Sequence, residues 1–194
     1  GRSNIMSRLN TIGIEISEDD PKVKKLLEEV KDREFIGYSY DGADASFELL
    51  ARRIIAEIPR YISIKEYDVS VTKNNVDEIV SKAKAKLEVD GEKIICEGEG
   101  NGPVHALDNA IRNNVDKLDK YAEYLKDLKL VDYKVRILNT GTEAVTRVSI
   151  ESTDSKGKNW FTIGVSPNII EASFRALIDS LDYKLFKDNA PASN

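Results

Sequence analysis

A separation of 66 positions recurs between identical residues of this chain and limits the folds that it can adopt. Chance rarely preserves one offset over so long a stretch, so we interpret residues 60–187 as two copies of one unit related by a pseudo-twofold axis. The turns of the two copies differ in length, so their middle strands align only with compensating gaps. The pairs that keep the offset are Tyr67 and Tyr133, Gly91 and Gly157, Gly98 and Gly164, Ala106 and Ala172, and Ala110 and Ala176.

Each copy begins with three stretches in which apolar and polar residues alternate. A period of two is typical of strands with one buried face, and Asp90-Gly91 is a strong signal for a hairpin turn. The alternating residues of the first copy are Ile62, Ile64, Tyr67, Val69, Val71, Ala83, Ala85, Leu87, Val89, Ile94 and Cys96. Those of the second are Val131, Tyr133, Val135, Ile137, Ala144, Thr146, Val148, Ile150, Phe161, Ile163 and Val165.

A helical pattern closes each copy. The apolar positions in the first are Val104, Leu107, Ile111, Leu118, Ala122 and Leu125, which predict one long helix after residues 100–103. In the second they run from Ile169 to Leu181. Antiparallel strands with one apolar face need a cover, and one helix per copy can provide it. We therefore predict an α+β fold of two pseudo-symmetric βββα units, antiparallel sheets covered by helices.

The N-terminal residues 1–58 predict a small helical subdomain. A first amphipathic stretch ends at Gly13, a second begins at Asp20-Pro21 with an N-cap and a first-turn proline, and a third runs up to Pro59. Three short helices rarely form a core alone, so we expect them to pack on another part of the protein. The expected organisation is this subdomain, then a domain at 59–187 with copies at about 60–126 and 127–187, and a frayed tail at 188–194.

Composition excludes several functions. One His and one Cys cannot supply a zinc site or an intramolecular disulfide, so we expect a reducing, cytoplasmic compartment. The 29 Lys and Arg residues against 34 Asp and Glu give a net charge of −5, which argues against nucleic-acid binding. No run approaches the roughly 18 apolar residues of a membrane span, so we expect no membrane partner.

Signals for catalysis are weak. His105 has no Ser or Cys at a recognised spacing, so binding or packing is the favoured role, and a small enzyme that uses His105 is the least favoured of our hypotheses. Cys96 continues a strand alternation and is expected to be buried. No phosphate-binding loop is present, since Gly98, Gly100 and Gly102 do not complete a dinucleotide fingerprint.

The two strand-to-helix turns, at residues 97–103 and 164–168, offer another kind of site. Backbone N–H groups at a helix N-terminus attract an anion, and glycine lets a ligand approach closely. The glycines can equally serve turn geometry alone. Because the surrounding walls are apolar, a small apolar amino acid, with its carboxylate at the helix end, fits the pattern. The wall residues are Val104, Leu130, Tyr133, Ile137, Ala144 and Val165.

Three motifs resemble the C-terminal regulatory domain shared by 2-isopropylmalate synthases and citramalate synthases. They are Gly-Asn-Gly-Pro-Val-His-Ala-Leu-Asp-Asn-Ala at 100–110, Leu-Val-Asp-Tyr-Lys-Val-Arg at 130–136 and Gly-Val-Ser-Pro-Asn-Ile-Ile-Glu-Ala-Ser at 164–173. Residues 1–4 and 42–50 are similar to the linker of the citramalate synthase branch. Two conservative departures are Asp44, where Glu is frequent, and Phe174, where Trp is common.

The resemblance implies a regulatory part without catalytic residues or a cofactor of its own. In the family, a catalytic barrel with a metal-binding His-x-His motif, which this sequence lacks, condenses acetyl-CoA with a 2-oxo acid, pyruvate for citramalate synthase. The regulatory domains form a homodimer and bind the end product, isoleucine in the citramalate branch and leucine in the other. Carried over by motif, the effector's charged end meets Gly100, Asn101, Gly102 and Val104, and its side chain meets Leu130, Tyr133, Ile137, Ala144, Val165 and Pro167. A dimerisation scaffold that binds no ligand remains the alternative.

Overall fold

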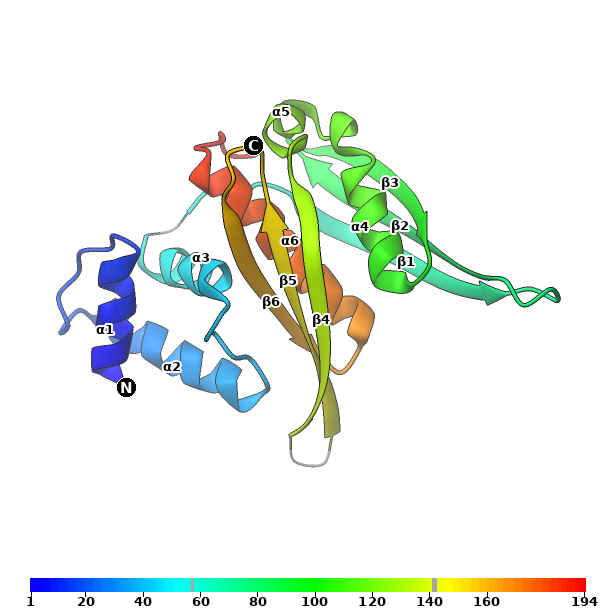
Figure 1. Cartoon of the computed structure of the whole chain (residues 1–194). Coiled ribbons are helices and arrows are strands. Elements are labelled where there is room, and N and C mark those ends of the chain that lie inside the picture. Colours follow the sequence, from blue (N-terminus) through cyan, green and yellow to red (C-terminus); the bar gives the residue numbers. More distant parts are fainter. Residues whose placement is uncertain (57, 141–142) are drawn as a thin grey trace.

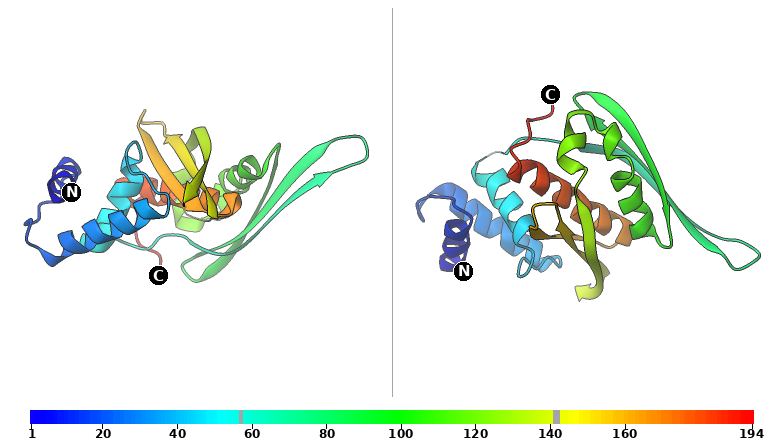
Figure 2. Two further views of the ribbon diagram at one scale, coloured as in Figure 1. Left: turned by 90° about the horizontal axis from the view of Figure 1, so that it is seen from below. Right: turned by 45° about the horizontal axis from the view of Figure 1, so that its top comes forward.

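The computed structural model describes residues 1–56, 58–140 and 143–194. Three N-terminal helices, α1 (Arg2–Thr11), α2 (Pro21–Phe35) and α3 (Asp44–Ile55), are followed by two sheets, each with its own helix. The second sheet and its helix lie between the N-terminal helices and the first sheet (Figures 1 and 2). In the described ranges, every helix is too short or too polar to cross a membrane.

The two βββα units are present as predicted. Unit one pairs β1 (Ser63–Lys73), β2 (Ile79–Val89) and β3 (Glu92–Gly100) in that antiparallel order, followed by α4 (Pro103–Arg112). Unit two pairs β4 (Lys129–Thr140), β5 (Glu143–Thr153) and β6 (Asn159–Ser166) in the same way, followed by α6 (Ile169–Lys187). The strand register slips between Ile64 and Glu66 in β1 and between Leu130 and Asp132 in β4, again 66 positions apart. Even the bulges therefore repeat.

Close packing of helix on strand explains two of the repeated glycines. A Cβ added to Gly98 would lie 2.3 Å from the backbone nitrogen of Ala110. One added to Gly164 would lie 2.1 Å from the carbonyl oxygen of Ala172 and 2.8 Å from the nitrogen of Ala176. Because backbone atoms cannot yield as a side chain does, glycine is required at both strand positions, and the small alanines keep the helices close.

The prediction of one long helix in unit one is wrong. α4 ends at Arg112 and is followed by two 3₁₀ turns, η1 (Val115–Lys117) and η2 (Asp119–Tyr121), and the short α5 (Ala122–Leu125). The Asn114 side chain donates to the carbonyl oxygens of Ala110 and Glu97, which gives the backbone an alternative to continuing the helix. Leu118 and Leu125 are still buried, so the apolar spacing was satisfied by a different backbone path.

Two apolar cores organise the part of the chain that the structure describes. The first joins both units and includes Leu87, Leu107, Ile150 and Phe174. The second lies between the three N-terminal helices and the face of unit two's sheet that α6 does not cover, and it includes Leu26, Phe47, Val145, Ile163 and Val165. The expectation that the helices pack on another part is thus met by unit two. The boundary at residue 58 stays a prediction.

The C-terminal tail differs from the frayed segment that we expected. The Ser193 backbone N–H donates to the carbonyl oxygen of Arg60 at 2.8 Å, and the Tyr121 hydroxyl donates to that of Pro191 at 2.7 Å. Ala190 is buried in the shared core. A polar segment without apolar periodicity can therefore still be held, because its backbone groups find partners on neighbouring elements.

Candidate functional site

An apolar strip on β4 is the first candidate feature. Tyr133, Val135 and Ile137, here called the β4 strip, are 43%, 40% and 74% exposed. In the register, Tyr133 pairs with Ile150 and Val135 pairs with Val148, both of which are buried in the core. Directly paired residues point to the same face of a sheet, so the β4 strip continues the core face of unit two. Helix α6 packs on β5 and β6, which leaves this edge strand open.

Four of the ten predicted site residues share this face. The register places Leu130, Tyr133 and Ile137 of β4 there, together with Ala144 of β5. Val165 does not join them, because it lies on the opposite face of the sheet in the core beneath the N-terminal helices. Both faces of β6 are covered, so alternation alone could not show which face Val165 occupies. Pro167 is exposed in the turn that precedes α6.

The other four predicted residues form the turn before α4, in unit one. Gly102 is the N-cap of α4 with an extended backbone, and its side-chain position has nothing within 4 Å. The Asn101 backbone N–H donates to Nδ1 of His105 at 3.3 Å, and the Asn109 amide nitrogen lies 3.2 Å from Nε2. The ring is therefore held by neighbours within its own turn and helix. Gly100 packs against this ring, and Val104 is buried.

A buried hydroxyl lies beside this turn. Ser81 pairs directly with Gly100 across β2 and β3. Its Oγ is buried and finds no hydrogen-bond partner within the described ranges. An unsatisfied buried polar group is costly, typically by about 1–3 kcal/mol. Beside the turn, therefore, one buried hydroxyl is unsatisfied within the described ranges, and the N-terminus of α4 has no side-chain cap.

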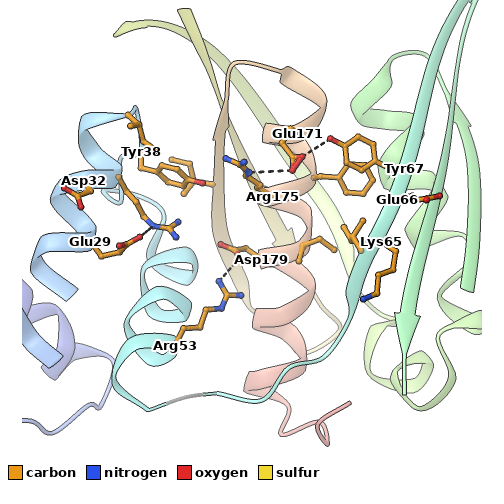
Figure 3. Close-up of a pocket in the computed structure, with 16 residues that line it drawn as sticks. Glu29, Asp32, Tyr38, Arg53, Lys65, Glu66, Tyr67, Glu171, Arg175 and Asp179 are labelled. Atoms are coloured by element: carbon orange, nitrogen blue, oxygen red, sulfur yellow. Dashed lines mark hydrogen bonds and ion pairs between the residues drawn. The ribbon is translucent and has the colours of Figure 1, made fainter. Parts of the chain in front are cut away.

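A large charged cavity is the second candidate feature, and it was not among the sites predicted from the sequence. It spans about 940 Å³, is open to solvent, and lies between α2 and α3 on one side and α6, β6 and β1 on the other (Figure 3). Figure 3 shows Arg53 of α3 reaching toward Asp179 of α6, with Arg175 and Glu171 farther along the same helix and Tyr67 on β1 opposite. Segments distant in the sequence therefore build one site.

Ion pairs and hydrogen bonds fix the cavity wall. Arg53 lies 3.3 Å from Asp179 and 3.1 Å from Asp182, so two carboxylates of α6 share one guanidinium. The Tyr67 hydroxyl donates to Glu171 at 2.8 Å. Burial, reinforced by this carboxylate, raises the pKa of Tyr67 to about 12. The side chain thus stays a neutral donor.

Burial also acts on the two shared carboxylates. It raises the pKa of Asp179 above its usual range, although the facing Arg53 opposes the shift. It raises the pKa of Asp182 to about 7, with Arg53 opposing and Asp179 adding to the shift. Within the described residues, Oδ1 of Asp182 is buried without a hydrogen-bond partner. One positive charge does not fully compensate two buried carboxylates.

A spacing in the sequence could have indicated this wall. Glu171, Arg175 and Asp179 are each four positions apart and form one charged stripe along the first part of α6. Residues four apart lie on one helix face. The apolar positions alone do not indicate this stripe, and nothing in the sequence shows that α2, α3 and β1 face it.

Residues 41–185 match the family model of the LeuA allosteric (dimerisation) domain. The (R)-citramalate synthase of Aquifex aeolicus is 45% identical over 191 residues, which cover 97% of this chain and 35% of that protein. The corresponding figures for the (R)-citramalate synthase of Geobacter sulfurreducens are 42%, 190 residues, 96% and 35%. A probable 2-isopropylmalate synthase of Methanopyrus kandleri is 25% identical over 180 residues. The chain spans about a third of the length of these curated relatives.

Proposed function

Because the chain belongs to the LeuA allosteric (dimerisation) domain family, we propose that it is the regulatory region of a citramalate synthase and binds isoleucine, the end product that inhibits the parent enzyme. Relatives between 37% and 45% identical carry the name (R)-citramalate synthase. In this proposal the whole protein condenses acetyl-CoA with pyruvate on a metal-dependent barrel, and the present chain senses the product. Leucine is the alternative effector, since moving one methyl group in an apolar pocket changes affinity by only about 1–3 kcal/mol.

The β4 strip supports self-association. Exposed apolar side chains that continue a core face, on an edge strand with free backbone groups, are typical of an interaction surface. We propose that a second copy of the chain covers this strip. In such a dimer the proposed site residues on the same face are enclosed. The helices at residues 1–58 then transmit the effect of ligand binding to the catalytic part of the parent protein.

The single observation that carries the ligand site is the turn before α4. The N-terminus of α4 presents backbone N–H groups without a side-chain cap, next to the unsatisfied Ser81 hydroxyl. These groups suit the carboxylate of an amino acid. The proposed site joins this turn with the apolar face of unit two; its residues are Gly100, Asn101, Gly102, Val104, Leu130, Tyr133, Ile137, Ala144 and Pro167.

A direct test is calorimetric titration of the chain with isoleucine, leucine and valine, together with thermal unfolding. We expect heat with isoleucine and a higher melting temperature, because a ligand at a hundredfold excess over its Kd stabilises the folded state by about 2.7 kcal/mol. No heat and no thermal shift from any of the three amino acids would contradict the proposal.

Gly102→Ala separates binding from geometry. The Gly102 backbone is extended, with φ −150° and ψ 170°, and a Cβ there meets open space, so the free energy of unfolding should fall only by the cost of alanine at an N-cap, at most about 1 kcal/mol. If the turn holds a carboxylate, the added methyl group should weaken isoleucine binding about tenfold or more, a loss of about 1.4 kcal/mol. Unchanged affinity would remove the turn from the site.

A dimerisation scaffold without a ligand is the second candidate. It is favoured by Gly98 and Gly164, whose missing side chains are already explained by the packing of α4 and α6 on the strands. Light scattering that shows a dimer, combined with titrations that show no heat, would favour this scaffold.

A further inference from the structure

The charged cavity between the N-terminal helices and α6 carries an inference that is independent of the site proposed above. Its walls come from α2, α3, β1, β6 and α6 of one chain, so it needs no second copy. Its volume of about 940 Å³ is at the upper end for small-molecule sites, which usually span about 300–1,000 Å³. The cavity can therefore be tested as a binding site in a single chain.

Of the five carboxylates that line the cavity, Asp32 is exposed to solvent, Glu66 pairs with Lys86, and the other three are engaged as acceptors within the cavity. Asp179 accepts from Arg53 through Oδ1 and from Ser46 through Oδ2, at 3.3 and 2.8 Å. Glu171 accepts from the Tyr67 hydroxyl, and Glu29 accepts from Nε of Arg33 at 2.9 Å. A ligand cation would have to compete with these donors for each of the three engaged carboxylates.

The donors, by contrast, have capacity left. Each guanidinium carries five N–H groups. Arg175 donates through Nη1 to the carbonyl oxygen of Val165 at 2.6 Å, and its Nε lies 3.7 Å from Glu171. Arg33 donates through Nε to Glu29. Lys65 has its nearest ion-pair partner, Glu88, at 3.9 Å. Donors from α2, α6 and β1 that are not fully used thus line the same cavity, which suits a ligand that accepts hydrogen bonds.

The lining also limits the charge and shape of that acceptor. The charges of Arg33, Arg53, Lys65 and Arg175 are offset by five acidic side chains of the same cavity, so each negative charge of a ligand adds repulsion and a multiply charged anion is disfavoured. Ile64 and Ile178 are half-buried beside the charged groups and give the cavity an apolar wall. A planar carboxylate matches the fork of a guanidinium. We propose that the cavity binds a small monocarboxylate with an apolar body, whose carboxylate is held by Arg33 and Arg175.

The test uses 3-methylpentanoate as the probe, followed by calorimetry and saturation-transfer NMR, and 3-methylpentan-1-ol as a probe of the same skeleton without the carboxylate. We expect the acid to bind and the alcohol to bind at least tenfold more weakly. Equal binding of the two, or no binding of the acid, would overturn the proposal.

Variants locate the probe. Arg33→Met and Arg175→Met keep a long side chain but remove the guanidinium, and each should weaken binding of the acid at least tenfold. Arg60→Met removes an exposed guanidinium outside the cavity and should leave it unchanged. The two test residues lie on different helices, so loss of folding in one variant, checked by circular dichroism, leaves the other decisive. Binding that survives in a folded Arg33→Met or Arg175→Met protein would overturn the assignment.

Tyr133→Asp separates this inference from the proposed function. It changes the β4 strip and none of the cavity walls. Binding of 3-methylpentanoate should therefore persist in this variant, whether or not isoleucine binding is lost. Loss of the acid in Tyr133→Asp would show that the probe occupies the other site and would contradict the cavity proposal.

Discussion

The two βββα units share a plan, yet their first strands have opposite surroundings. Tyr67 in β1 and Tyr133 in β4 occupy equivalent positions of the repeat. The Tyr67 ring stacks on Phe174 of α6 with centroids 4.1 Å apart, and its hydroxyl donates to Glu171. Tyr133 is 43% exposed. The same residue in the same register is therefore covered in one unit and open in the other.

The residues that the two helices present differ at the equivalent positions. Phe174 and Glu171, which cover Tyr67, lie in the first two turns of α6. The offset of 66 places Asp108 and His105 at these positions in α4, where Asp108 pairs with Arg112 of its own helix. α4 therefore has no aromatic ring at the position of Phe174, and the apolar face of β4 stays free.

The largest expected effect tests what the units have in common. Gly98→Ala and Gly164→Ala each place a methyl group against helix backbone, at 2.3 and 2.1 Å, and should each lower the free energy of unfolding by about 3 kcal/mol. Chemical denaturation measures both. A cost in only one unit would show that the close contact of strand and helix is not equivalent in the two.

A smaller effect tests what separates the units. Tyr67→Ala removes a stacked, hydrogen-bonded ring and should cost about 2 kcal/mol. Tyr133→Ala at its repeat position should change the stability of the monomer by less than about 0.5 kcal/mol, measured at high dilution. Equal costs would mean that Tyr133 is covered within one chain.

An effect of similar size, visible only as a change with pH, concerns the docking of α3 on α6. Folding holds the pKa of Asp182 at about 7, well above the unfolded value of about 3.9, so the folded state binds more protons between these values and stability falls as pH rises through this window. Between pH 5 and pH 8 the unaltered chain should lose on the order of 2 kcal/mol of its free energy of unfolding, and Asp182→Asn should abolish this loss.

The repeat supplies the control for this prediction. Asp116 occupies the position equivalent to Asp182 in unit one and is exposed. Asp116→Asn should keep the pH dependence of the unaltered chain in thermal unfolding between pH 5 and pH 8. If Asp182→Asn also keeps the pH dependence, the Asp182 carboxylate does not determine how the stability of the contact between α3 and α6 changes with pH.

Local signals in the sequence were sufficient for much of the fold. The Asp20 side chain accepts from the Lys22 backbone N–H at the start of α2, as its N-cap position predicts. Asp90 and Gly91 have φ values of 52° and 78°, the geometry of a two-residue hairpin turn. These features depend on neighbours in the chain, so a short stretch of sequence determines them.

The site was predicted less completely, because its features depend on contacts between distant segments. The turn before α4 and the residues of β4 stay predictions as a ligand site, and the sequence did not show which face Val165 occupies, since both sides of β6 are covered. The charged cavity joins α2, α3, β1, β6 and α6. Only the packing of the N-terminal helices on unit two brings these together, and apolar periodicity does not specify that packing.

The most direct test of the account is sedimentation of the chain beside two variants with similarly exposed targets. Tyr133 on the β4 strip and Ile95 on β3 are 43% and 46% exposed. We predict that the unaltered chain and Ile95→Asp are dimers, and that Tyr133→Asp is a folded monomer. A monomeric unaltered chain, or a Tyr133→Asp variant that dimerises as well as Ile95→Asp, would contradict the claim that the open face of β4 is the surface for a second copy.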